Sequence, residues 1–188
     1  MPTTAANYVL TIDGQSYDIS LDTQISVKVG EQNVAAKLVQ KDFLTFATEN
    51  FSFEHPKQFI PAKSNLGDGL FQTVLMTPVG SAVMVQEYLN MAPSSLMDLM
   101  INEITKEERE YGYQIESNPV SKTLPGGKVL DGMVVTSKYK GSDMKRVFYT
   151  YSVKDSGLFI MTQIDYEIGL DDEEIIDNII DSLKITMQ

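Results

Sequence analysis

Few residues of this chain could carry out acid, base or nucleophilic chemistry. His55 is the single histidine, it stands directly before Pro56, and there is no cysteine. A catalytic triad needs a base that a third group orients, and zinc sites favour several His or Cys ligands. We therefore expect a structural role for His55 and no thiol chemistry.

The serines and glycines carry no catalytic or nucleotide-binding motif. Ser94, Ser95 and Ser182 lie outside any Gly-x-Ser-x-Gly elbow. The pair Gly126-Gly127 lacks the spacing of a phosphate-binding loop. Cap and turn roles account for these residues, so the sequence predicts no cofactor.

The acidic run Asp171-Asp172-Glu173-Glu174 is the strongest metal candidate. Carboxylate oxygens suit Ca²⁺ or Mg²⁺, so a weak site is one interpretation. The other is helix capping, because the helix dipole stabilises carboxylates in a first turn. The run lacks EF-hand spacing, and we therefore favour capping and predict no metal site.

The overall charge is acidic. The 188 residues include 26 Asp and Glu against 15 Lys and Arg, for a formal net charge of -11. This balance argues against nucleic acid as the main partner, because phosphate binding needs clustered cations. No stretch reaches the roughly 18 apolar residues of a membrane span. The start of the sequence shows no signal peptide, so we expect a cytoplasmic protein, or a periplasmic one if a leader has been removed.

The charges are also segregated along the chain. Residues 122–154 hold seven bases and two acids, a net of +5, whereas residues 155–181 hold nine acids and no base, a net of -9. Such an asymmetry can steer a partner or favour head-to-tail association. The alternative is a solvated surface on which the two signs fall unevenly.

The pattern of apolar residues indicates mostly strands. Alternation over the first fifty residues, with a hairpin at Asp13-Gly14, predicts a β-meander. Residues 61–69 are rich in Gly, Asn, Asp and Ser and are predicted to form a loop. The remaining strands are expected at residues 51–56, 70–76, 82–89, 113–123, 128–139, 144–153 and 158–165.

Two helices are expected among these strands. One covers about residues 95–111, with Ser95 and Asp98 as a capping box, and the other begins at Asp171 with Glu174 in the same role. Short hairpin connections exclude a doubly wound parallel sheet. The predicted fold class is α+β, an antiparallel β-sheet packed with two main helices.

Two segments give the chain a resemblance to a known family. Phe51-Ser52-Phe53-Glu54-His55-Pro56 and Ile179-Ile180-Asp181-Ser182-Leu183-Lys184-Ile185, with the mid-chain helix between them, resemble the Mog/PsbP-like family. The likeness covers residues 51–186. It implies a binding module, because relatives include a partner of the Ran GTPase, an extrinsic photosystem subunit and bacterial DcrB-like proteins. We expect a single domain, with residues 1–50 as an N-terminal strand extension of the family core.

Hairpin parity divides the side chains of the last four strands between two faces. A four-residue turn at Lys154–Gly157 pairs Val153 with Leu158 and makes one face almost wholly apolar, suited to lie beneath a helix. The opposite face mixes methionine, aromatic and polar side chains, a composition suited to adaptable recognition. The alternative is that a helix or the N-terminal strands cover it. Its candidate partner-binding residues are Met133, Tyr139, Met144, Arg146, Phe148, Phe159 and Met161.

These observations favour a non-enzymatic protein-binding module, an adaptor or a chaperone-like protein. Its expected partner is a protein or a peptide, and a second copy of the chain in a homodimer is an alternative. The second hypothesis is a hydrolase that uses paired carboxylates, which would need two of them facing one another in a pocket.

Overall fold

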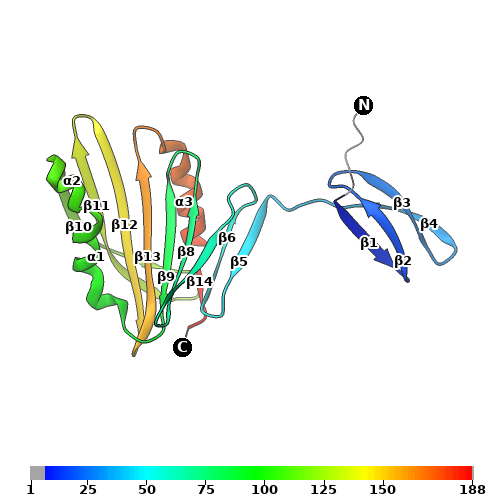
Figure 1. Cartoon of the computed structure of the whole chain (residues 1–188), viewed down its shortest axis with the longest axis horizontal. Coiled ribbons are helices and arrows are strands. Elements are labelled where there is room, and N and C mark those ends of the chain that lie inside the picture. The colour runs from blue at the N-terminus through cyan, green and yellow to red at the C-terminus, as the bar shows by residue number, and fades with distance from the viewer. Residues whose placement is uncertain (1–6, 188) are drawn as a thin grey trace. The chain divides into compact units, whose positions relative to one another are not determined.

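The computed structural model describes residues 7–187 (Figure 1). The chain divides between Asp42 and Phe43 into two compact units. This boundary corrects the one expected between residues 50 and 51. The strand β5 (Phe43–Ala47) pairs with β6 (Phe51–Pro56), so its backbone hydrogen bonds place it in the second unit. Cooperative unfolding of the whole chain as one domain stays a prediction.

The first unit consists of two antiparallel hairpins. The first joins β1 (Tyr8–Ile12) to β2 (Gln15–Ile19) through Asp13-Gly14, which both have positive φ as predicted. The second joins β3 (Gln24–Val29) to β4 (Gln32–Lys37), and a single parallel bridge links Leu21 to Leu38. The expected meander is therefore two separate two-stranded sheets.

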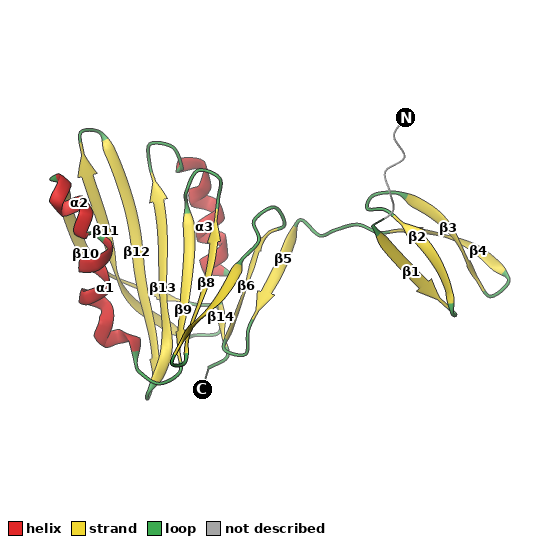
Figure 2. Cartoon of the chain, viewed as in Figure 1, coloured by secondary structure: helices red, strands yellow, loops and turns green. Residues whose placement is uncertain are grey.

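The second unit is built on a seven-stranded antiparallel sheet (Figure 2). Its strands lie in the order β10-β11-β12-β13-β9-β8-β7, and each consecutive pair is antiparallel. This confirms the predicted α+β class. The bounds are β7 (Ala62–Gly67), β8 (Leu70–Met76), β9 (Ala82–Tyr88), β10 (Gln114–Thr123), β11 (Val129–Tyr139), β12 (Ser142–Val153) and β13 (Ser156–Asp165).

A smaller sheet lies in the same unit. Its order is β14-β6-β5, with β14 (Lys184–Ile185) antiparallel to β6. Residues far apart in the sequence therefore meet at β6. The edge strand β7 corrects the predicted loop at residues 61–69. Every residue of β7 is exposed, so it lacks the alternation of apolar side chains that reveals a strand in a sequence.

The mid-chain helix is interrupted. A 3-10 turn η1 (Pro93–Leu96) leads into α1 (Met97–Ile104), and α2 (Lys106–Tyr111) follows after Thr105. The hydroxyl of Thr105 donates to the carbonyl of Ile101 at 2.7 Å, a bond that competes with regular helix geometry. No side chain caps η1 or α1, and Ser95 instead donates to the carbonyl of Ala92.

The last helix starts two residues later than expected. A 3-10 turn η2 (Leu170–Asp172) precedes α3 (Glu173–Asp181), and no side chain caps either element. The capping boxes predicted at both helices are therefore wrong. Glu173 and Glu174 do occupy the first turn of α3, where the helix dipole favours them.

The two helical segments cover opposite faces of the large sheet. Ile160 and Leu158 pack with Ile176 and Ile179 of α3, whereas Phe159 packs with Ile101 of α1. Neighbouring residues of a strand point to opposite faces, so the sheet separates two cores. The apolar face predicted to lie beneath a helix is confirmed. The turn is shorter than expected, because Tyr151 and not Val153 pairs with Leu158, and this shift of two residues preserves the faces.

Candidate functional site

The mixed face of the sheet is mostly covered. Phe148 and Phe159 are fully buried and pack with Ile101 of α1, and Met133 and Met161 are half-buried against the same cluster. For these four residues the structure shows the alternative, in which a helix, α1, covers the face. They do not form the open recognition surface that we predicted.

Arg146 is engaged inside the molecule. Its guanidinium donates to both carboxylate oxygens of Glu108 on α2, at 2.7 and 3.0 Å, and to Oε1 of Gln163 at 2.8 Å. Ser137 donates to the same carboxylate at 2.6 Å. Burial raises the pKa of Glu108, but the hydrogen bonds from Arg146 and Ser137 outweigh it and hold this pKa below its usual range. Arg146 therefore anchors α2 to the sheet.

Tyr139 and Met144 lie near the turn between β11 and β12 and are half-buried. The Tyr139 ring stacks on Tyr113 with 5.0 Å between centroids, and the Lys140 ammonium lies 4.9 Å from its centroid. A shallow hollow of about 350 Å³ beside Tyr139 is lined by Lys138, Lys140 and other residues of this end of the sheet. These two residues remain predicted partner contacts.

His55 has the structural environment expected for it. The side chain is buried, and Nδ1 lies 3.0 Å from the carbonyl oxygen of Pro56. Its ring meets Phe53 edge-on with 6.1 Å between centroids. This packing among apolar side chains is consistent with a core histidine.

Two residues of the acidic run 171–174, Asp172 and Glu173, bind different partners. Thr77 donates to Asp172 at 2.5 Å, and Glu173 accepts bonds from Lys145 at 2.9 Å and from Tyr166 at 2.8 Å. These two donors hold the pKa of Glu173 below its ordinary value. Among residues 7–187, no three His, Asp or Glu side chains converge as a metal site would require.

Part of the predicted charge asymmetry is also used internally. Lys122 forms an ion pair with Asp181, and Lys145 forms one with Glu173. The basic strands and the acidic helix thus hold each other within one molecule. In the described part of the chain, Asp171, Glu174 and Asp177 form no ion pair, and all three are exposed.

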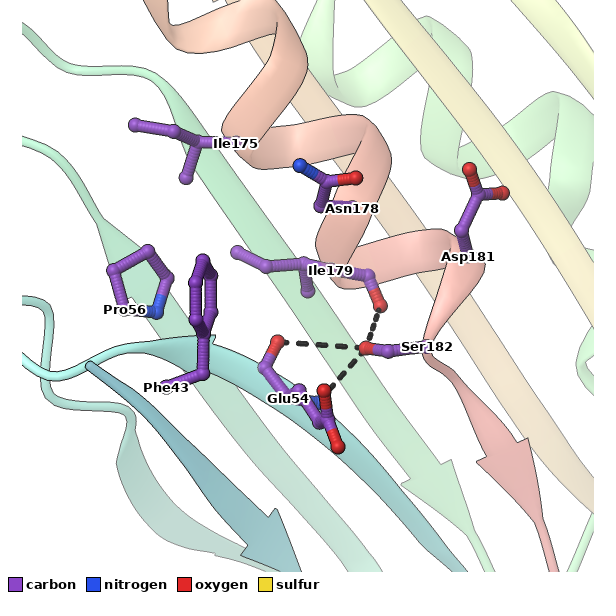
Figure 3. A pocket seen from close by; sticks show the side chains of 8 residues that line it. All are labelled: Phe43, Glu54, Pro56, Ile175, Asn178, Ile179, Asp181 and Ser182. Atoms are coloured by element: carbon purple, nitrogen blue, oxygen red, sulfur yellow. Dashed lines mark hydrogen bonds between the residues drawn. The ribbon is translucent and has the colours of Figure 1, made fainter. Parts of the chain in front are cut away.

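The most promising site is a groove between α3 and the β5–β6 hairpin (Figure 3). It has a volume of about 400 Å³. Phe43 and Pro56 form one wall, and Ile175 and Ile179 face them from α3 (Figure 3). Phe43 is 53% exposed. The groove therefore offers an accessible apolar surface.

Polar groups complete the groove and fix its shape. Ser182 accepts a hydrogen bond from the Glu54 N–H at 2.8 Å and donates to the Ile179 carbonyl at 2.9 Å. These bonds join the end of α3 to β6 (Figure 3). Asn178 lines this groove and also a neighbouring hollow that contains Asp171, Glu174 and Asp177. The apolar groove is thus continuous with an acidic surface of α3.

Two carboxylates line the groove, which bears on the hydrolase hypothesis. Glu54 and Asp181 lie on either side of Ser182 and point apart (Figure 3). Asp181 forms its ion pair with Lys122. An acid/base pair needs two carboxyl groups that face a common substrate bond, and this arrangement does not provide it.

Sequence reasoning missed this groove because its walls come from distant segments. The sequence places Phe43 in the N-terminal extension, far from the last helix, whose residues Ile175 and Ile179 form the opposite wall. A usable signal was the apolar composition of Phe43–Ala47.

No protein-family model matches this chain, and no curated protein matches it. The solution structure of cyanobacterial PsbP from Synechocystis sp. PCC 6803 is similar, with a TM-score of 0.54 and 9% identity over 77% of this chain and 92% of that chain. A crystal structure from Bacteroides thetaiotaomicron VPI-5482 gives a TM-score of 0.43 and 9% identity over 79% of this chain and 50% of that chain. The fold is PsbP-like, as the resemblance predicted. Residues 7–187 contain no helix that is long and apolar enough to span a membrane.

Proposed function

We propose that this chain is a non-enzymatic protein-binding module, adaptor-like or chaperone-like, and that the groove between α3 and the β5–β6 hairpin receives a segment of a partner protein. The observation that carries the proposal is Phe43, a large apolar side chain that is half exposed beside Ile175 and Ile179. Exposed apolar surface next to polar groups that fix orientation is typical of recognition sites.

The attachment of both groove walls to the folded unit supports the same proposal. Ile179 is buried in the main core, and Ser182 binds the backbone of β6, so both walls are attached to the folded unit. A preformed groove loses little conformational entropy when a ligand enters it. An apolar side chain of a partner would therefore gain contacts at low cost.

The proposal is tested by selecting ligands from a library of random peptides displayed against the full chain. We expect enriched peptides to share an apolar position and to shift the backbone amide resonances of β5 and α3 in the nuclear magnetic resonance spectrum. Perturbations confined to other elements, or no enrichment, would contradict the proposal.

A matched pair of variants provides the control. Phe43→Ser removes the exposed aromatic ring of the groove and should weaken binding of a selected peptide by about tenfold or more. Leu99→Ser removes a side chain of α1 that is 55% exposed, close to the 53% of Phe43, and should leave the affinity unchanged. Equal losses in both variants would point to a general effect on folding.

The remaining expectations stay proposals. A hydrolase would reveal itself by turnover of a substrate that substitution of a carboxylate residue abolishes. A cytoplasmic location and a homodimer are to be tested by fractionation and by sedimentation of the full chain.

A further inference from the structure

The strand beside the groove has an unpaired edge. β5 pairs with β6 on one side, and within residues 7–187 no strand pairs with its other side. Its five residues, Phe43–Ala47, contain no charge and no proline, and its pairing with β6 has no bulge. Proteins usually protect an open edge with charged residues, prolines or bulges, because an open edge can pair with another chain. This edge is unprotected.

The faces of β5 place this edge next to the groove. Phe43, Thr45 and Ala47 alternate with Leu44 and Phe46, so the first three share one face. Phe43 lines the groove on that face, whereas the Phe46 ring stacks on Phe53 at 5.3 Å on the other. A strand added to the open edge would direct every second side chain to the face of Phe43.

The acidic residues around the groove indicate the charge of the ligand strand that would pair with β5. Glu54 and Asp181 line the groove, and no described Lys or Arg does. Lys122 offsets part of the charge of Asp181. Beyond Asn178 the surface continues to Glu174 and Asp177, which are exposed and acidic. A basic ligand is favoured here, because charge complementarity speeds association and rejects acidic partners.

The same charge disfavours a second copy of the chain. Pairing of two β5 edges would bring together two chains that each carry a net charge of -11. Like charges at close range oppose such an interface.

On the premise of the proposed function, we infer that the partner contributes an extended basic segment. This segment pairs as an additional strand with the open edge of β5, places an apolar side chain beside Phe43, and directs Lys or Arg toward Glu54 and the exposed acids of α3.

The inference is tested with three synthetic peptides and the full chain. The first has Lys two residues before and two residues after a central Phe, with Val between them, so that Lys and Phe share one face of the strand. The second replaces each Lys by Glu, and the third repeats the first with its backbone nitrogens methylated. Methylation removes the N–H groups that a strand needs for pairing while the side chains stay the same. Affinities are measured by isothermal titration calorimetry at low and at raised ionic strength.

We expect the basic peptide to bind about tenfold or more tightly than the acidic one, with an affinity that falls as salt screens the charges. The methylated peptide should show no binding. Glu54→Gln should lower the affinity for the basic peptide by about two- to fivefold. Glu110→Gln, which neutralises an exposed acid on α2, should leave its affinity unchanged.

The outcomes separate this inference from the function on which it rests. Equal affinity for the basic and acidic peptides would overturn the charge assignment, and undiminished binding of the methylated peptide would overturn strand pairing. If either occurs while Phe43→Ser still abolishes binding of library-selected peptides, the proposed groove function stands. If the library-selected peptides also bind Phe43→Ser with unchanged affinity, the proposed function fails as well. A dimer that Phe43→Ser dissociates, seen by sedimentation, would replace the basic segment with a second copy.

Discussion

The hydroxyl of Ser182 accepts a hydrogen bond at 2.8 Å from the backbone N–H of Glu54, a residue 128 positions earlier in the chain. Ser182 follows α3 directly, and Lys184 then pairs with Ser52 as β14 begins. The hydroxyl thus extends the pairing of β6 to a residue that precedes β14. One side chain therefore holds the C-terminal segment against the strand that forms a wall of the groove.

Replacing Ser182 with alanine removes this connection. We expect Ser182→Ala to lower the free energy of unfolding by about 1 kcal/mol, the usual net contribution of one hydrogen bond. Urea denaturation measures this change. Ser64→Ala alters an exposed serine on β7 and should change stability by less than about 0.5 kcal/mol. A loss no larger than that of the control would show that the Glu54 N–H finds another partner.

The Glu108–Arg146 pair predicts a specific dependence of stability on pH. The folded pKa of Glu108 lies below its ordinary value, so the pair stabilises the fold above the unfolded pKa of about 4.3. This contribution is lost as the pH falls through the folded pKa. Glu108→Gln should therefore unfold more easily at neutral pH and show a flatter acid limb in urea titrations at several pH values.

Glu173→Gln provides a comparison for this experiment. The pKa of Glu173 is also lowered, but its side chain is 34% exposed against 16% for Glu108, so solvent screens its pairing more strongly. We expect a smaller change in the acid limb. Arg146→Met should cost more than either, about 3–5 kcal/mol, because Glu108 would lose its cationic partner and keep only the Ser137 hydroxyl. Similar losses in all three variants would contradict this ranking by burial.

Met161 tests how closely α1 covers the sheet. Met161→Glu places a carboxylate among Phe148, Phe159 and the side chains of α1. Arg146, a cation on the same face, is already paired with Glu108. We expect a loss of several kcal/mol, seen as a much lower melting temperature. Met161→Leu keeps the volume and should cost less than about 1.5 kcal/mol. A stable Met161→Glu variant would mean that this face opens to solvent.

Deletions test whether the chain unfolds as one domain. Removing residues 1–42 leaves β5 intact, and we expect residues 43–188 to fold with a melting temperature within a few degrees of the full chain. Removing residues 1–45 also takes Phe43–Thr45 away from β6 and should destabilise the remainder clearly. A large loss with the shorter deletion would support the single cooperative domain that the sequence predicts.

The hairpins were the most predictable part of the fold. Asp13-Gly14 adopts positive φ in a two-residue turn, which Asp and Gly tolerate and which matches the twist of the strands. Alternation along β12 and β13 then assigned side chains to faces correctly even though the turn after Val153 is shorter than expected. A shift of two residues leaves each side chain on the same face of the sheet, so local patterns were sufficient to assign the faces.

Long-range contacts could not be predicted in this way. Nothing near Phe148 or Phe159 indicates that α1 covers them, since an apolar strand face is equally compatible with a helix or with a partner. The groove depends on Phe43 and Ile179 meeting across the fold. The strand β7 has only exposed side chains, so its pairing with β8 is carried by backbone groups that a sequence does not display.

The separation of the two cores has a consequence for oxidative damage. The cluster beneath α1 is packed with five half-buried methionines, Met84, Met97, Met100, Met133 and Met161. The cluster beneath α3 consists mainly of isoleucine, leucine, valine and phenylalanine, which peroxide leaves unchanged. Conversion of methionine to its polar sulfoxide disrupts apolar packing. An oxidant would therefore loosen α1 and α2 first, while the sheet kept its layer with α3 and the groove beside it.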